Sequence, residues 1–182
     1  GANYMKTVIY AHADQKKRAQ LSLNDYKISS DKLIEFFGWK RDSVNSNLSK
    51  LGIQNLGERM RWTQFTPYWQ LRNEAWTDIL IGNYQKASKL LDEIEKKYNQ
   101  NRNDLRGVLD IMQGNLEQGI SKLDKIGTGK YPLYFKAQAL RSLGKTENAI
   151  QLLDSIRFLP IQNINNSLIV KRSNDLYKEL IN

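Results

Sequence analysis

The chain has 182 residues, a formal net charge of +9 and no cysteine. Its length suits one domain, or a small domain joined to a repeat array, and the lack of cysteine excludes disulfides and thiolate metal sites. No run of 18 apolar residues occurs, so no membrane-spanning helix is predicted. The opening Gly1-Ala2 resembles the remnant of a cleaved tag, which leaves the compartment open between cytoplasmic and extracytoplasmic.

The net positive charge per residue is about twice as high in the N-terminal third as in the rest of the chain. Residues 1–66 hold 11 Lys and Arg against 6 Asp and Glu, whereas residues 67–182 hold 17 against 13. This excess is compatible with a polyanionic partner such as DNA. It is also ordinary for a protein rich in lysine and asparagine, so it gives that partner modest support.

The N-terminal third is predicted to be helical. One long helix is expected from about Tyr4 to Leu23. Ser30 is placed to cap a second helix that Gly38 ends, and a third is expected from about Arg41 to Gly52. The apolar faces of these last two helices are Leu33, Ile34 and Phe37, and then Val44, Leu48 and Leu51. Two short helices joined by a tight turn that contains glycine have helix-turn-helix geometry.

This spacing resembles the winged-helix family of bacterial regulators, and the resemblance implies two short strands around Gly57 within residues 53–66. It also implies DNA contacts, in which Lys40, Arg41 and Lys50 face phosphates and Asn45 and Ser46 face bases. A second interpretation stays open, in which residues 30–52 are a helical hairpin that only caps the rest of the chain.

A pattern repeated three times occupies the chain from about residue 68. A glycine is followed by a small residue five positions on, a leucine four later and an isoleucine three later, and another small residue stands seven before the glycine. The glycines are Gly82, Gly114 and Gly144, spaced 32 and then 30 residues apart. A period in this range indicates a stacked array rather than a single globular core.

Each unit is expected to be a helical hairpin. The glycine ends the first helix in a left-handed turn, and the small residues let the two helices approach closely. Leucine and isoleucine continue one buried stripe along the second helix. The middle unit carries Gly107 and Gly119 at both small positions, which weakens its helices by about 1 kcal/mol each relative to alanine. With room beside Gly119, an alanine there is expected to be neutral or slightly stabilising.

The pattern resembles the tetratricopeptide repeat, a helix–turn–helix unit of about 34 residues. The resemblance covers roughly residues 68–160, and a helix at about 163–181 is expected to cap the array. The predicted fold is therefore all-α: a superhelical array of helical hairpins with a C-terminal capping helix over residues 67–182. It is preceded, over residues 1–66, by a small helical or winged-helix-like region.

The resemblance also implies a binding surface, because in that family the first helix of each unit lines a concave groove. The residues placed there are Trp69, Arg72, Trp76, Asp104, Val108, Tyr131, Tyr134, Gln138 and Arg141. Aromatic side chains mixed with arginine suit an extended peptide or a partner helix. Arg72 and Asn73 fit the first two places of the family's carboxylate clamp, but Trp76 and Asp104 depart from it. Recognition of a C-terminal carboxylate is therefore not predicted.

No catalytic or metal motif stands out. There is no glycine-rich phosphate loop, serine elbow or paired-carboxylate motif, and the lone His12 is expected to lie on the surface. The first functional hypothesis is a non-enzymatic module that binds a protein or peptide and needs no cofactor or metal. The second is a regulator whose N-terminal third binds DNA. The third is the soluble extracytoplasmic domain of a larger membrane or envelope protein, anchored by a segment absent from this sequence.

Overall fold

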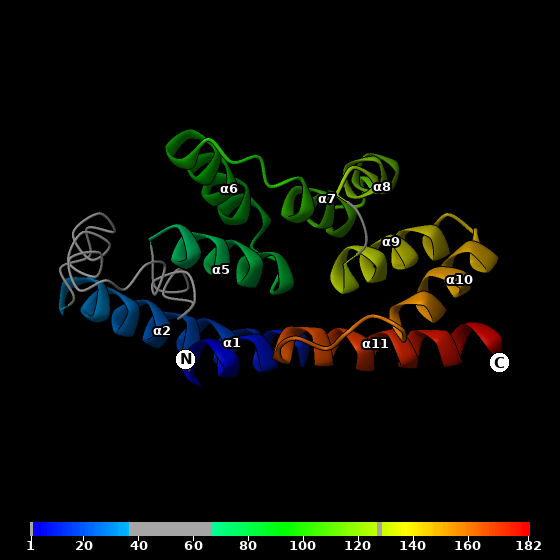
Figure 1. Ribbon diagram of the computed structural model, residues 1–182, viewed down its shortest axis with the longest axis horizontal. Coiled ribbons are helices and arrows are strands. Elements are labelled where there is room, and N and C mark those ends of the chain that lie inside the picture. Colours follow the sequence, from blue (N-terminus) through cyan, green and yellow to red (C-terminus); the bar gives the residue numbers. More distant parts are fainter. Residues whose placement is uncertain (1, 37–66, 127–128) are drawn as a thin grey trace, which may run out of the picture.

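The computed structural model describes residues 2–36, 67–126 and 129–182. These residues form helices, with no strand among them, which confirms the all-α class. The helices pack mainly in consecutive antiparallel pairs, as expected for an array of hairpins (Figure 1). They are α1 (Ala2–His12), α2 (Lys16–Phe36), α5 (Pro67–Leu80), α6 (Tyr84–Tyr98), α7 (Asn103–Met112), α8 (Leu116–Asp124), α9 (Lys130–Ser142), α10 (Thr146–Ile156) and α11 (Ile164–Ile181).

The three repeated glycines end the first helix of their hairpins, as predicted. Gly82, Gly114 and Gly144 have φ angles of 86°, 90° and 74°, in the left-handed region that glycine occupies at little cost. In each turn the following residue donates its backbone N–H to a carbonyl five positions earlier, for example Asn83 to Asp78 at 2.8 Å. This pairing satisfies carbonyls that the helix end would otherwise leave free.

The buried stripe also lies where the pattern predicts it, with one exception. Ala75, Ala87, Ala137 and Ala149 are fully buried between paired helices, and Leu91, Leu123 and Leu153 lie beside them in one core. Ile94 and Ile156 are buried too, but Ile126 is 40% exposed. The reason is local: α8 ends at Asp124, so Ile126 lies beyond the helix that was expected to carry it.

Both glycines of the middle hairpin are required by a close helix contact, which corrects the expectation of room beside Gly119. A Cβ atom added at Gly119 would lie 2.5 Å from Ile111 Cγ1 and 2.7 Å from the Gly107 carbonyl oxygen. One added at Gly107 would lie 2.7 Å from Leu123 Cδ2. The low helix propensity of glycine is thus offset by the closer packing of α7 on α8.

Gly119→Ala is therefore expected to destabilise the protein, by about 1–3 kcal/mol, because the added methyl group overpacks a contact that involves backbone atoms. Urea unfolding followed by circular dichroism measures the change. Ser121→Ala, at an exposed position on the same helix, is the control and should change stability by less than about 0.5 kcal/mol. A Gly119→Ala protein as stable as the parent would contradict the close contact.

The N-terminal region differs from its predicted helix boundaries. The segment expected as one helix from Tyr4 to Leu23 is divided between α1 and α2, and Asp14 turns the chain between them with a φ of 56°. Ser30 is not a cap; it lies within α2 and is 2% exposed. Its hydroxyl oxygen is buried and has no hydrogen-bond partner among the described residues, whereas the neighbouring Ser29 bonds back to the Asp25 carbonyl at 2.8 Å.

The α1–α2 hairpin follows the same frame as the three repeats. Relative to the left-handed turn residue Asp14, Thr7 stands seven positions before, and Ala19, Leu23 and Tyr26 stand five, nine and twelve after. All four are buried. The turn hydrogen bond also recurs, from the Gln15 N–H to the Tyr10 carbonyl at 2.9 Å. The described part of the chain therefore contains a fourth hairpin of this kind.

The two ends of the described chain meet. Helix α11 packs on α10 and α9, as a capping helix would, but it also contacts α1, which in turn packs on α5. Figure 1 shows α1 and α11 along the edge of the molecule opposite α6 and α8, with α5 and α9 between. Helices α5 and α9 are thus each contacted by another element of the same chain, α5 by α1 and α9 by α11.

Candidate functional site

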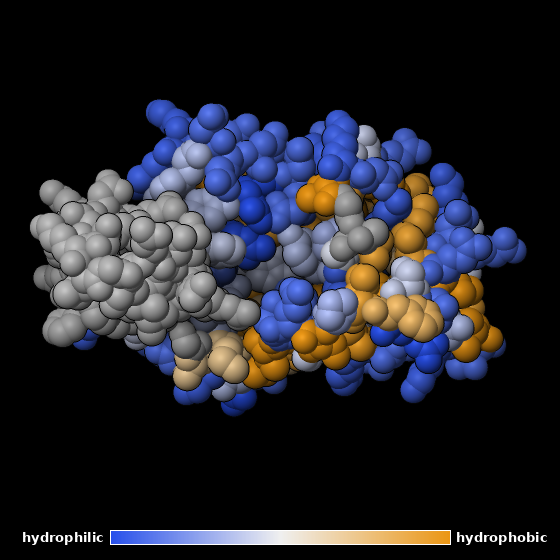
Figure 2. All heavy atoms as spheres, viewed as in Figure 1, coloured by the Kyte–Doolittle hydropathy of each residue, from blue (hydrophilic) through white to orange (hydrophobic). Residues whose placement is uncertain are grey.

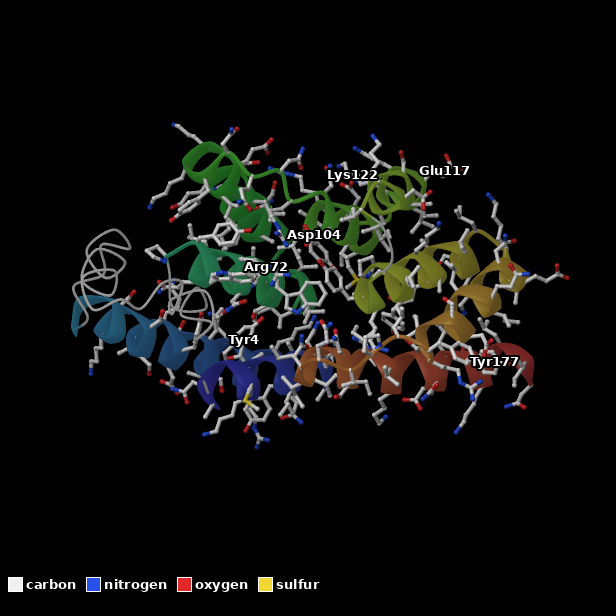
Figure 3. All side chains as sticks on the ribbon, in the orientation of Figure 1. Tyr4, Arg72, Asp104, Glu117, Lys122 and Tyr177 are labelled. Carbon is white, nitrogen blue, oxygen red and sulfur yellow. The ribbon has the colours of Figure 1, made fainter. Side chains whose placement is uncertain are left out.

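Five of the nine side chains predicted to line the inner surface lie together in the structure. They come from the first helices α5, α7 and α9, and Figure 3 shows Arg72 between Asp104 above it and Tyr4 below it. We call this group, with two residues that it contacts, the inner-face cluster. It consists of Tyr68, Trp69, Arg72, Trp76, Arg102, Asp104 and Tyr131.

Asp104 is the junction of the cluster. Its carboxylate accepts hydrogen bonds from the guanidinium of Arg102 and from the hydroxyl of Tyr131. Arg72 approaches the same oxygen from α5, with its Nη2 atom 4.0 Å away, which is beyond hydrogen-bond distance. Two guanidiniums therefore face one carboxylate, and the cluster holds one excess positive charge.

Aromatic rings surround the two arginines. The Arg72 guanidinium carbon lies 5.2 Å from the centre of the Trp69 ring, within the range of a cation–π contact. Arg102 donates to the Tyr68 hydroxyl at 3.0 Å, and Trp76 packs against Tyr131 with ring centres 5.0 Å apart. These rings restrict both guanidiniums to defined positions.

The phenols of Tyr4 and Tyr131 stay neutral at physiological pH. Burial raises the pKa of Tyr131 well above its ordinary value, and the Asp104 carboxylate raises it further. Burial likewise raises the pKa of Tyr4, although the nearby positive charge of Arg72 opposes this. Neither phenol therefore supplies negative charge to the arginines, and Asp104 is their only anionic neighbour among the described contacts.

The other four predicted inner-surface residues have different surroundings. Val108 is fully buried in the core, and Tyr134, 3% exposed, lies beneath the guanidinium of Arg172 from α11. Arg141 is exposed and pairs with Glu179 of α11, whereas Gln138 is half-buried. Helix α11 therefore covers part of the predicted surface, and the inner-face cluster is the part where aromatic and basic groups gather.

His12 is not a surface residue, which corrects the expectation from sequence. Its Nε2–H donates to Asn165 Oδ1 at 2.9 Å, and Arg172 donates to its Nδ1 at 3.3 Å. Arginine can only donate, so Nδ1 must be the unprotonated nitrogen. Trp76 Nε1 donates to the same Asn165 oxygen at 3.2 Å. His12 thus joins α1 to α11 where the two ends of the chain meet.

A buried pair of carboxylates on α5 was missed by the search for catalytic motifs. Glu74 and Asp78 are one helical turn apart and almost fully buried. Lys86 Nζ lies 2.8 Å from Glu74 and 2.9 Å from Asp78, and Lys27 pairs with Glu74 as well. Burial acts to raise the pKa of Glu74, but hydrogen bonds from both lysines outweigh it, so this pKa lies below its ordinary value. The group is a charge-paired link between α2, α5 and α6.

The residues of the DNA-binding hypothesis lie outside the described part of the chain. This applies to Lys40, Arg41, Asn45, Ser46 and Lys50, and also to the strands expected within residues 53–66. DNA binding therefore stays a prediction. Among the residues that the structure describes, no group of three or more His, Cys, Asp or Glu could hold a metal ion. No described helix is both long and apolar enough to span a membrane.

Sequence reasoning missed Arg102 and Tyr68, although each lies within two residues of a residue that it did select. Arg102 is the residue before α7, in the connection between two hairpins, so no position in the repeat frame identifies it.

Figure 2 shows that the face viewed is hollowed near its centre, where hydrophilic colours and the pale colours of intermediate hydropathy meet. Such a surface suits a ligand that carries both an apolar group and a charge.

The comparisons with known proteins found no likeness for this chain. No family model matches it, and neither does any curated protein or solved structure. The chemistry of the inner-face cluster is therefore the basis on which a function is inferred.

Proposed function

We propose that the protein is a non-enzymatic interaction module that binds an extended segment of a partner protein at the inner-face cluster. The observation that carries the proposal is the convergence of Trp69, Arg72 and Tyr131 from two different hairpins around Asp104. Aromatic and arginine side chains in defined positions are the groups that contribute most to protein–protein affinity. The resemblance to tetratricopeptide repeats supports the same surface, since that family binds partners with its first helices.

The partial exposure of the cluster is consistent with this role. The side chain of Arg72 is 18% exposed, and Trp69 and Tyr131 are also half-buried. Their positions are fixed by packing, yet part of each side chain remains accessible. A preorganised site of this kind loses little conformational entropy on binding, which favours affinity for a segment that is itself flexible.

The proposal is tested by selecting peptides from a random display library on the whole protein and measuring the affinity of the enriched peptides by fluorescence polarisation. Trp69→Ala is expected to weaken their binding at least about tenfold, because it removes the ring beneath Arg72. Phe158→Ala is the control. It removes a ring that is 83% exposed in the connection between α10 and α11, and should change affinity less than about twofold.

Two results would contradict the proposal. One is a selection in which no peptide is enriched over the empty support. The other is a set of peptides whose affinity is the same for Trp69→Ala as for the parent protein, since those peptides would bind elsewhere. Circular dichroism confirms that each variant is folded before its affinity is compared.

A further inference from the structure

Helix α1 turns an apolar strip toward solvent. Met5 and Ile9 lie one helical turn apart and are 47% and 41% exposed, whereas Val8 and Ala11, on the opposite side of the helix, are buried. A single exposed apolar side chain is ordinary on a protein surface, but two at this spacing lie side by side on one helix face. Helix α1 packs on α2, α5 and α11, and none of these three helices covers the strip.

The connection between α10 and α11 adds further exposed apolar side chains beside the end of α1. It carries Phe158 and Ile161, which are 83% and 60% exposed, and it leads to Asn165, which accepts a hydrogen bond from His12 at the end of α1 at 2.9 Å. Figure 2 shows hydrophobic residues gathered in the lower part of the viewed face, where Figure 1 places α1, this connection and the start of α11. We call this surface the outer apolar face; it consists of Met5, Ile9, Phe158 and Ile161.

Basic residues border the outer apolar face. Lys6 lies on α1, Lys17 and Arg18 lie in the first turn of α2, and all three are exposed. The Arg18 guanidinium carbon lies 5.8 Å from the centre of the Tyr10 ring, which keeps it beside α1. None of the three forms an ion pair with another described residue. Residues 2–18 hold four Lys and Arg against one Asp, so this part of the surface is positively charged.

Apolar and unpaired basic residues on one surface favour an anionic membrane over other partners. At such a membrane, apolar side chains enter the boundary between headgroups and acyl chains, while lysine and arginine stay among the lipid phosphates. The cores of protein–protein interfaces, in contrast, are depleted in lysine. A nucleic acid would neutralise the cations through its phosphates but would leave most of the apolar area in water. The membrane surface is therefore the partner that accommodates both kinds of side chain.

We propose that the outer apolar face docks the protein on an anionic lipid surface, with its apolar side chains at the level of the headgroups and Lys6, Lys17 and Arg18 against the phosphates. The inference goes beyond the proposed function, because it concerns the other side of α1. Tyr4 of α1 is buried near Arg72 of the inner-face cluster, whereas the outer apolar face points away from α5. A docked protein would thus keep its inner-face cluster free for a partner segment.

Sedimentation of the whole protein with lipid vesicles tests the proposal. Vesicles of equal parts phosphatidylglycerol and phosphatidylcholine should carry the protein into the pellet at about 0.1 M salt, and vesicles of phosphatidylcholine alone should not. The reason is that each basic residue near an anionic surface strengthens partitioning about fivefold. Protein that stays in solution with the anionic vesicles, or that sediments equally with both kinds, would overturn the proposal without any variant being made.

Matched variants separate the outer apolar face from general attraction to a basic protein. Exchanging both Met5 and Ile9 for serine leaves the net charge unchanged and should weaken binding to the anionic vesicles at least about fivefold. The control is Ile126→Ser, because Ile126 is 40% exposed but follows α8 at the opposite edge of the molecule (Figure 1); it should change binding less than about twofold. Equal losses in the two proteins would show that apolar contact at α1 is not required, and the proposal would fall.

The charges are compared in the same way. Lys6→Gln should weaken binding about fivefold. Lys89→Gln removes the same charge from an exposed position on α6, more than a screening length from a membrane at α1, and should change binding less than about twofold. If the two variants lose affinity equally, only the net charge of the protein matters, which contradicts a defined docking face.

Insertion is read at single positions, because the chain contains no cysteine. The environment-sensitive dye NBD on Ile9→Cys should gain intensity and shift to the blue when anionic vesicles are added, while the same dye on Ile126→Cys should not respond. An equal response of the Ile9→Cys label to random duplex DNA would identify a nucleic acid instead. Self-association that Met5 and Ile9 are needed for, measured by sedimentation velocity in the absence of vesicle binding, would identify a second copy of the chain. Either result would overturn the proposal.

Discussion

Replacing Lys86 with methionine is expected to lower the free energy of unfolding by about 3 kcal/mol. The ammonium group of Lys86 lies 2.8 Å from Glu74 and 2.9 Å from Asp78, and both carboxylates are almost fully buried. Removing one partner of a buried ion pair leaves an uncompensated charge, which costs about 3–5 kcal/mol. We expect the smaller cost in this range, because the Lys86 side chain is half exposed and Lys27 still pairs with Glu74 after the substitution.

Urea unfolding followed by circular dichroism measures this loss. Lys89→Met is the control on the same helix: Lys89 is exposed and has no ion pair among the described residues, so less than about 0.5 kcal/mol is expected. Adding Asp78→Asn to Lys86→Met should restore part of the stability, because it removes the charge left unpaired. Equal effects of Lys86→Met and Lys89→Met would show that the buried carboxylates do not depend on Lys86.

Acid is expected to loosen the junction between α1 and α11 before the carboxylates titrate. Burial, together with the positive charge of Arg172, lowers the pKa of His12 to about 4 despite the opposing hydrogen bond to Asn165. The neutral imidazole is therefore the form that the fold favours. Its contribution to stability is fully present above the unfolded pKa of about 6.5 and is lost as the pH falls toward 4. The loss attributable to His12 should reach about 2 kcal/mol by pH 5.

The comparison that isolates this effect is the free energy of unfolding of the parent protein and of His12→Gln, measured between pH 7.5 and 5. The parent should lose about 2 kcal/mol more than the variant over this interval. Glu74 does not affect this comparison. Because its pKa in the folded protein is lowered, its contribution to the free energy of unfolding is lost only when the pH falls below about 4.5, where the unfolded chain takes up a proton at this residue. Parallel curves for the two proteins would contradict the half-buried, neutral state of His12.

The first hairpin shows how a sequence pattern can be present and still be missed. Thr7, Asp14, Ala19 and Leu23 occupy the same frame as Ala75, Gly82, Ala87 and Leu91. The search depended on glycine at the turn, and Asp14 adopts the left-handed conformation without it. Asparagine and aspartate visit this region more often than other non-glycine residues. The offset of 68 residues between Asp14 and Gly82 is two periods of about 34, which was the available signal.

The features that the amino-acid sequence predicts correctly are local ones. The hairpin turns at Gly82, Gly114 and Gly144, and the buried alanines beside them, follow from contacts within one unit of about 30 residues. Left-handed turns, helix periodicity and close helix packing depend on residues near one another in the chain. The inner-surface residues, with Trp69, Arg72 and Tyr131 among them, came instead from the resemblance to the tetratricopeptide repeat, which assigns that surface to the first helix of each unit.

The placement of the hairpins relative to one another could not be predicted from the sequence and is seen in the three-dimensional structure. The contact of α1 with α11 through His12 and Arg172 joins residues 160 positions apart, and the approach of Arg72 to Asp104 joins two different hairpins. Each depends on the small rotation between successive hairpins, which accumulates along an array and is set by side-chain packing at every interface. The repeat pattern specifies one hairpin at a time, so it does not predict that α1 and α11 come into contact.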